Sequence, residues 1–134
     1  MPLNDDATIP DDAILLRVLT KDWITTEHER RRPTSHAFRD ANAETSCFID
    51  SQVTRTELMK LFPGFEVAAV QARVFRANGF ALERRPDEVP EGFAGDRQSH
   101  VVVGPTQPCT RNVQTRMARA VVQDEQVTIF VLEE

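Results

Sequence analysis

The amino-acid sequence predicts a single α+β domain, with a mixed or mostly antiparallel sheet of about five to six strands and about two to three short helices. Its length of 134 residues suits one domain. Short apolar runs of strand length recur along the chain, and turn-forming residues separate them. Other segments combine helical spacing of apolar residues with helix start or stop signals. The helix predicted within the strand–helix–strand segment 63–84 is short for a parallel crossover, so we expect one compact α+β domain.

The first predicted strand, residues 13–19 (AILLRVL), is apolar except for Arg17 at its centre. A guanidinium in such a strand either finds a buried partner or points outward from a sheet edge. The preceding residues 1–12 carry acids and no base. We expect these residues to form an acidic, flexible N-terminal tail, so the folded domain is predicted to span residues 13–134.

Residues 25–43 are polar and interrupted by Pro33, which predicts a long irregular loop. A loop of this length inside a small domain is often functional. The next segment, residues 44–53, is predicted to be a short strand because Cys47 and Ile49 fall on one face at a period of two.

The middle of the chain predicts helices and strands in quick succession. Residues 55–62 have apolar side chains at helical spacing, and Thr54 with Glu57 forms a capping-box pattern. Pro63-Gly64 then ends the helix. The next predicted elements are a strand at 65–70, a short helix at 71–79 and a strand at 80–84.

The last third of the chain begins with a second long loop, residues 86–99, which contains prolines and glycines. Residues 100–104 (HVVVG) are almost wholly apolar and predict a central strand. Residues 110–122 predict a helix with Thr110 as its N-cap. The final strand, residues 126–134, has apolar residues on both faces, so we expect it to be covered on both sides.

The charge is unevenly distributed along the chain. The formal net charge is −5, yet all 16 lysines and arginines lie between two acidic ends, and most of them are arginine. Arginine pairs bidentately with carboxylate or phosphate, which favours recognition of an anion. Neither a run of ~20 apolar residues nor a signal peptide is present. We therefore expect a cytoplasmic protein without a membrane partner.

Familiar catalytic and cofactor motifs are missing from the sequence. His28, His36 and His100 do not have the spacing of metal ligands. There is no nucleophile elbow, and the glycines form no phosphate-binding or dinucleotide loop. We expect no metal and no cofactor, and enzymatic activity is left undecided.

The segment from Arg30 to His36 concentrates guanidinium groups, hydroxyls and a histidine around Pro33. A rigid loop that brings such donors together can hold a phosphate or a carboxylate. In the alternative interpretation, the arginines are a solvated run, and Thr34 and Ser35 cap a turn. The predicted ligand-binding residues are Arg17, Arg31, Arg32, Thr34, Ser35, His36 and His100.

Nucleic acid is the less favoured anion. Arg111, Arg116 and Arg119 fall on the last predicted helix and could extend a phosphate-binding stripe. However, the sequence pI is about 5.2, and no stacking aromatics are interleaved with the cations.

Four segments, LLRVL, RPTSHAF, TSCF and SHVVVG, together resemble an uncharacterised group of small bacterial proteins, and this resemblance implies no activity. The chain is also similar to the ADP-ribosyltransferase-like fold, which includes RES-type NAD-degrading toxins. That fold places an Arg or His on an early strand, a Ser or Thr on the next and a catalytic acid late. Arg17 and Ser46 match the first two positions, whereas Glu125 and Glu133 are merely late acids. This similarity implies an NAD-processing enzyme.

Three functions follow from these observations. The leading hypothesis is a small bacterial protein that binds an anionic, phosphorylated or nucleotide-like ligand on the Arg30–His36 loop. The second is a protein-interaction module, such as an accessory or immunity subunit of a multi-protein bacterial system, because acidic ends can steer a basic partner. The third is an NAD-processing enzyme. The sequence does not indicate an oligomeric state.

Overall fold

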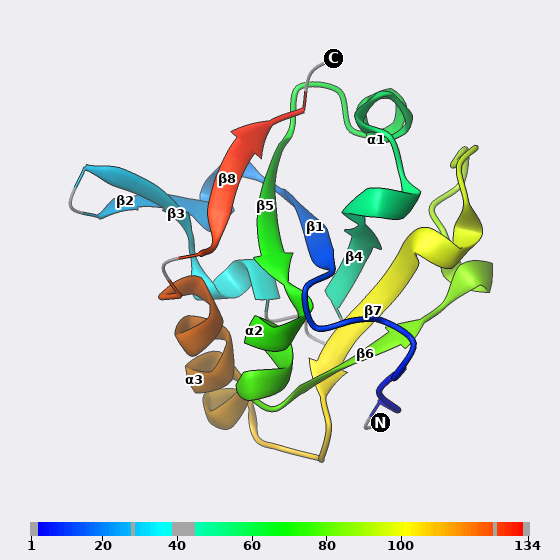
Figure 1. The fold of residues 1–134 in the computed structure, drawn as a ribbon. Coiled ribbons are helices and arrows are strands. Elements are labelled where there is room, and N and C mark those ends of the chain that lie inside the picture. Colours follow the sequence, from blue (N-terminus) through cyan, green and yellow to red (C-terminus); the bar gives the residue numbers. More distant parts are fainter. Residues whose placement is uncertain (1–2, 28, 39–44, 125, 133–134) are drawn as a thin grey trace.

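A six-stranded antiparallel sheet forms the centre of the computed structural model, which describes residues 3–27, 29–38, 45–124 and 126–132 (Figure 1). Its strands are β1 (Ile14–Leu19), β4 (Thr45–Ile49), β5 (Glu66–Gln71), β6 (Phe80–Arg84), β7 (His100–Pro105) and β8 (Thr128–Val131). The strand order is β6-β7-β4-β1-β5-β8, and every neighbouring pair is antiparallel. The predicted α+β class with one compact domain is therefore confirmed.

The inner strands lie where the sequence is most continuously apolar. Every residue of β7 is buried, as expected for a central strand. β1 pairs with β4 on one side and with β5 on the other, and its register places Leu15 opposite both Ile49 and Val70. These apolar pairs fix the register, because a shift by one residue would turn every side chain to the wrong face.

Helices cover both faces of the sheet. They are α1 (Arg55–Leu61), α2 (Ala72–Ala77) and α3 (Arg111–Val122), and the predicted capping box of Thr54 and Glu57 begins α1. On one face, α2, α3 and the 3₁₀ turn η2 (Ser35–Phe38) bury one apolar cluster (Figure 1). On the other face, α1 and the segment around Phe93 bury a second cluster. The remaining 3₁₀ turns are η1 (Lys21–Trp23), η3 (Asp50–Gln52), η4 (Pro86–Glu88) and η5 (Arg97–Ser99).

A β-hairpin replaces the first part of the irregular loop predicted for residues 25–43. Its strands, β2 (Ile24–Glu27) and β3 (Arg30–Pro33), form a separate two-stranded sheet. Glu29 in the turn has a φ of 65°, in the left-handed region that tight turns require. These strands were not predicted from the sequence, because three consecutive arginines break the apolar alternation on which strand prediction depends. Residues 39–44 of the predicted loop lie outside the described residues.

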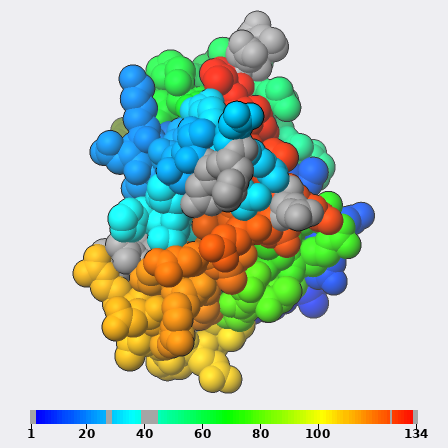
Figure 2. All heavy atoms as spheres, turned by 90° about the vertical axis from the view of Figure 1, so that its left-hand side faces the viewer, coloured from blue at the N-terminus to red at the C-terminus, as the bar shows by residue number. Residues whose placement is uncertain are grey.

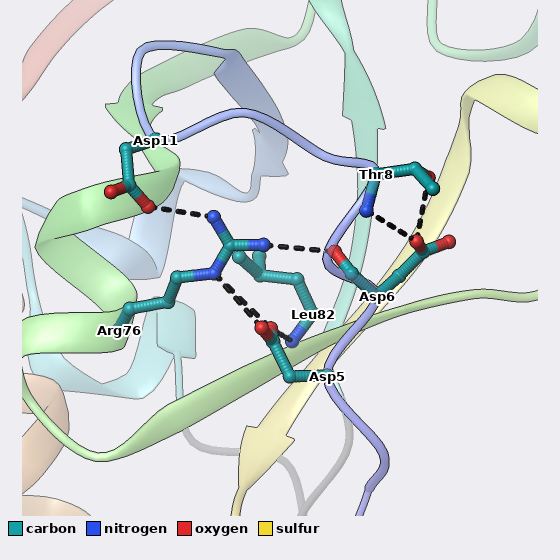
Figure 3. A network of polar contacts seen from close by, with 6 residues as sticks. All are labelled: Asp5, Asp6, Thr8, Asp11, Arg76 and Leu82. Atoms are coloured by element: carbon teal, nitrogen blue, oxygen red, sulfur yellow. Dashed lines mark hydrogen bonds and ion pairs between the residues drawn. The ribbon is translucent and has the colours of Figure 1, made fainter.

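The N-terminal segment, residues 3–12, packs against the domain where the sequence predicted a flexible tail. Leu3 and Ile9 are buried in apolar clusters, and the Asp6 amide donates to the carbonyl of Leu82 in β6. The Arg76 guanidinium contacts the carboxylates of Asp5 and Asp11 and the Asp6 carbonyl (Figure 3). The acids that suggested a solvated tail are therefore engaged within the fold.

Among the described residues, no helix has the length and apolar character needed to cross a membrane.

Candidate functional site

The arginine run of β3 attaches the hairpin to distant parts of the chain. Arg30 Nη2 donates to the Val127 carbonyl at 2.8 Å, and Arg32 Nη1 donates to the Val122 carbonyl at 3.0 Å. Arg31 Nη2 lies 2.5 Å from Glu66 Oε2 in an ion pair. Each guanidinium therefore has its own partner, and the run is neither freely solvated nor gathered at one point.

A concave site opens where the hairpin, η2 and the end of α3 meet. Its volume is about 280 Å³. We call it the basic pocket, and its lining residues are Thr25, Arg32, Thr34, Ser35, Arg119, Val122 and Gln123. Figure 2 shows this side of the molecule, on which residues of the hairpin and η2 border those of α3.

Among the described residues, the lining of the basic pocket carries two positive charges and no carboxylate. Arg119 is exposed, and its guanidinium has no hydrogen bond or ion pair within the described part of the chain. Arg32 donates one N–H to Val122, the last residue of α3, whereas a guanidinium has five N–H donors. The carboxyl end of a helix contributes about half a negative charge, which is too small to cancel two guanidiniums. The described lining therefore carries a net positive charge.

Thr34 contributes a hydroxyl without a partner. Its Oγ1 is buried and makes no hydrogen bond, a situation that costs roughly 1–3 kcal/mol. The Thr34 backbone is fixed, because its amide donates to the Trp23 carbonyl at 2.7 Å. Rotation of the side chain toward the pocket would break no hydrogen bond, so an oxygen-rich ligand can supply the missing partner.

The polar side chains of Thr25, Ser35 and Gln123 complete the lining. Within the described residues, none of the three makes a side-chain hydrogen bond. These two hydroxyl groups and the Gln123 side-chain amide can therefore donate to a bound anion without breaking a hydrogen bond to a described residue.

Arg17 contacts the η2 turn through its guanidinium and does not line the basic pocket. Its Nε donates to the Ala37 carbonyl at 2.8 Å, and its Nη1 donates to the Ser46 carbonyl at 3.1 Å. The guanidinium also lies 5.0 Å from the centre of the Trp23 ring. Of the two interpretations of Arg17, the structure therefore agrees with the one that required a buried partner.

Arg31, His36 and His100 also lie outside the basic pocket. Arg31 pairs with Glu66, and His36 is exposed on η2 without lining the pocket. His100 is buried on the other face of the sheet, with its ring against Phe48 and its Nδ1 2.9 Å from the Arg85 carbonyl.

The structure thus brings together three of the seven predicted residues: Arg32, Thr34 and Ser35. It adds Arg119, which the sequence had suggested only as part of a nucleic-acid stripe. The other two arginines of that interpretation, Arg111 and Arg116, are exposed on α3 and do not line the pocket.

Arg17 and Ser46, which match two positions of the ADP-ribosyltransferase pattern, have their side chains on opposite faces of the sheet. Arg17 shares a sheet face with Leu15 and Leu19 in the α2–α3 cluster. Ser46 shares the opposite face with Phe48. The two side chains therefore do not form one site, and neither lines the basic pocket.

Cys47 lies buried beside Arg17 in the interior of the sheet. Burial raises the pKa of its thiol to about 12, and the nearby charge of Arg17 offsets this only in part. Because the thiolate is the reactive form, nucleophilic chemistry at Cys47 is disfavoured near neutral pH. Cys109 is free and exposed.

Two larger concavities differ from the basic pocket in their chemistry. One, of about 480 Å³, lies between the N-terminal segment and η3, and mixes Asp12 and Asp50 with Arg84. The other, of about 430 Å³, is bordered by Ile24 and Phe65. Neither presents two cations without a carboxylate. Within the described residues, no three His, Cys, Asp or Glu side chains gather in a way that could hold a metal ion.

Comparison of the chain with protein-family models, with curated proteins and with solved structures finds no match.

Proposed function

We propose that this protein binds a small anionic ligand in the basic pocket. The observation that carries the proposal is that Arg32 and Arg119, from elements far apart in the sequence, line one small concavity, whose described lining residues include no carboxylate. Anions bind where guanidiniums and hydroxyls converge, because charge-assisted hydrogen bonds are stronger than neutral ones.

The competing explanation assigns Arg32 a purely structural role, since it caps the carboxyl end of α3 through the Val122 carbonyl. That role does not extend to Arg119, which has no partner among the described residues. Nor does it account for the unpaired Thr34 hydroxyl beside them. An anion between the two guanidiniums accounts for both features.

The acidic N-terminal segment offers little support for the alternative of an interaction module. Asp5 and Asp11 are paired with Arg76, and Asp6 Oδ2 lies 3.6 Å from Arg84 Nε. Carboxylates already paired within the fold attract a basic partner less strongly than free ones. We therefore favour a small anion over a basic protein as the ligand.

Isothermal titration calorimetry with inorganic phosphate, citrate and small sugar phosphates tests the proposal. We expect saturable binding of at least one anion, and at least a tenfold loss of affinity in Arg119→Gln. The matched control is Arg116→Gln, one turn earlier on α3 and outside the pocket lining, which should bind like the unmodified protein. Equal affinities in both variants would place the ligand elsewhere.

A further inference from the structure

Building on the proposed function, we propose that the ligand of the basic pocket is a phosphate monoester, whose dianionic phosphoryl group lies between Arg32 and Arg119. The proposal concerns the class of anion, and it separates monoesters from carboxylates and from the phosphodiesters of nucleic acid.

Charge balance gives the first argument. Within the described part of the chain, the lining carries two guanidiniums and no acid. A phosphate monoester carries about −1.5 to −2 charges at pH 7, whereas a carboxylate or a phosphodiester carries one. Only the monoester neutralises both arginines. With either of the other anions, one guanidinium would remain uncompensated beside the ligand.

The arrangement of donors gives the second argument. Arg32 comes from β3, Ser35 from η2 and Arg119 from α3, so the donors approach from three elements around the hollow. A phosphoryl group presents three terminal oxygens in different directions. A planar carboxylate has two oxygens and can satisfy one guanidinium fork fully. The three-sided lining therefore fits the phosphoryl group better.

Pocket size and composition give the third argument. A volume of about 280 Å³ is at the lower end of the roughly 300–1,000 Å³ typical of ligand pockets. Val122 is the one apolar residue of the lining, and no aromatic ring is present on which a base could stack. The pocket therefore recognises a phosphoryl group, while the organic part of the ligand lies outside.

The ionisable surroundings make the proposal testable by pH. Besides the two lining arginines, the charged residues of the hairpin, η2 and α3 are Glu27, Glu29, Arg30, Arg31, His36, Arg111 and Arg116, and Asp124 follows α3. Of these residue types, only histidine ordinarily changes charge between pH 5 and 8. A positive charge gained by any histidine near the pocket at low pH would strengthen anion binding, and the His36→Asn variant removes this contribution. The second ionisation of a phosphate monoester, with a pKa of about 6, would strengthen binding as the pH rises. The two effects have opposite signs.

The experiment measures the affinity for methyl phosphate, dimethyl phosphate and acetate by calorimetry at pH 5.0 and 7.5. We expect affinity for methyl phosphate to rise about tenfold with pH, because its dianionic fraction rises by about that factor. His36→Asn should retain this rise. Dimethyl phosphate and acetate should bind at least tenfold more weakly at pH 7.5, and Arg119→Gln should remove most of the preference.

Two results would overturn the proposal, and they are distinguishable. If methyl phosphate and dimethyl phosphate bind equally, or if affinity falls with rising pH, the ligand is an anion of another class and the proposed function stands. If no anion binds saturably at either pH, anion binding in the basic pocket is itself wrong.

Discussion

The two regions built around Arg76 and Arg119 use the same side chain in opposite ways. Arg76 extends from α2 toward the N-terminal segment, where it contacts two carboxylates and the Asp6 carbonyl (Figure 3). Arg119 lies at the basic pocket with no partner among the described residues. One guanidinium is saturated by its own chain, and the other retains its capacity to bind.

This difference shows that a high local density of arginine does not by itself leave guanidinium donors unoccupied. The Arg30–Arg32 run is the densest cluster of cations in the sequence. Yet Arg31 is paired with Glu66, and Arg30 reaches a backbone carbonyl. Within the described part of the chain, unoccupied guanidinium donors remain at Arg119, which lines the basic pocket.

The largest expected effect is a loss of stability when Arg76, whose donors are occupied within the fold, is replaced. Arg76→Ala should lower the free energy of unfolding by about 2 kcal/mol, because the Asp5 and Asp11 carboxylates and the Asp6 carbonyl lose their charged donor. Urea denaturation measures the change. The matched control is Arg73→Ala on the same helix, at an exposed position, which should change stability by less than about 0.5 kcal/mol. Equal effects of the two variants would mean that the Arg76 contacts do not hold the N-terminal segment.

On the unsaturated side, Arg119→Gln should reduce anion affinity at least tenfold, or about 1.4 kcal/mol, and leave stability within about 0.5 kcal/mol. The side chain is exposed and makes no contact that folding requires. Parallel calorimetry and urea denaturation separate the two quantities. A loss of stability matching the loss of affinity would assign Arg119 a structural role instead.

Arg32 makes a contact within the fold and also lines the basic pocket. Its variant should therefore lose both stability and anion affinity. Arg32→Gln removes a charge from the pocket and the donor to the Val122 carbonyl. We expect weaker anion binding together with a loss of about 1 kcal/mol in stability. Amide hydrogen exchange at the carboxyl end of α3 should accelerate. Unchanged exchange there would show that the cap is dispensable.

The smallest expected effect depends on pH. Hydrogen bonds from the Thr8 hydroxyl and amide lower the pKa of Asp6 from its ordinary value of 3.8 in the folded protein. The folded chain thus binds this proton more weakly than the unfolded chain. The stabilisation is complete above the unfolded pKa, near pH 4, and is lost as the pH falls through the lower folded pKa.

Asp6→Asn should therefore cost a few tenths of a kcal/mol at pH 7 and less at pH 2.5. Urea denaturation of both proteins at the two pH values measures this difference. If the loss of stability in Asp6→Asn grew as the pH fell, the pKa of Asp6 would not be lowered in the folded protein.

The sequence predicted the central sheet and the helices because their signals are local. The apolar run of β7 and the capping box of Thr54 and Glu57 each lie within a few residues. The hairpin was missed because its attachment is remote: Arg32 and Arg30 reach carbonyls 90 and 97 positions away. Such contacts leave no periodic pattern in the strand that makes them.

The sequence prediction grouped only some of the residues that line the basic pocket. Arg32, Thr34 and Ser35 were predicted together because cations and hydroxyls are adjacent in the sequence, and the structure places these three in one lining. Arg119 was not linked to them, since only the packing of α3 against η2 brings it near. The N-terminal acids were interpreted as a solvated tail because their partner, Arg76, lies 65 to 71 positions away.

The most direct test of the central claim is a ¹⁵N chemical-shift titration of the intact protein with inorganic phosphate at pH 7.5. We expect the amide resonances of Ser35 and Gln123 to shift saturably with one dissociation constant, and Arg119→Gln to abolish the shifts. Resonances at the basic pocket that stay unchanged while phosphate reaches tens of millimolar, or that shift equally in the variant, would contradict the account.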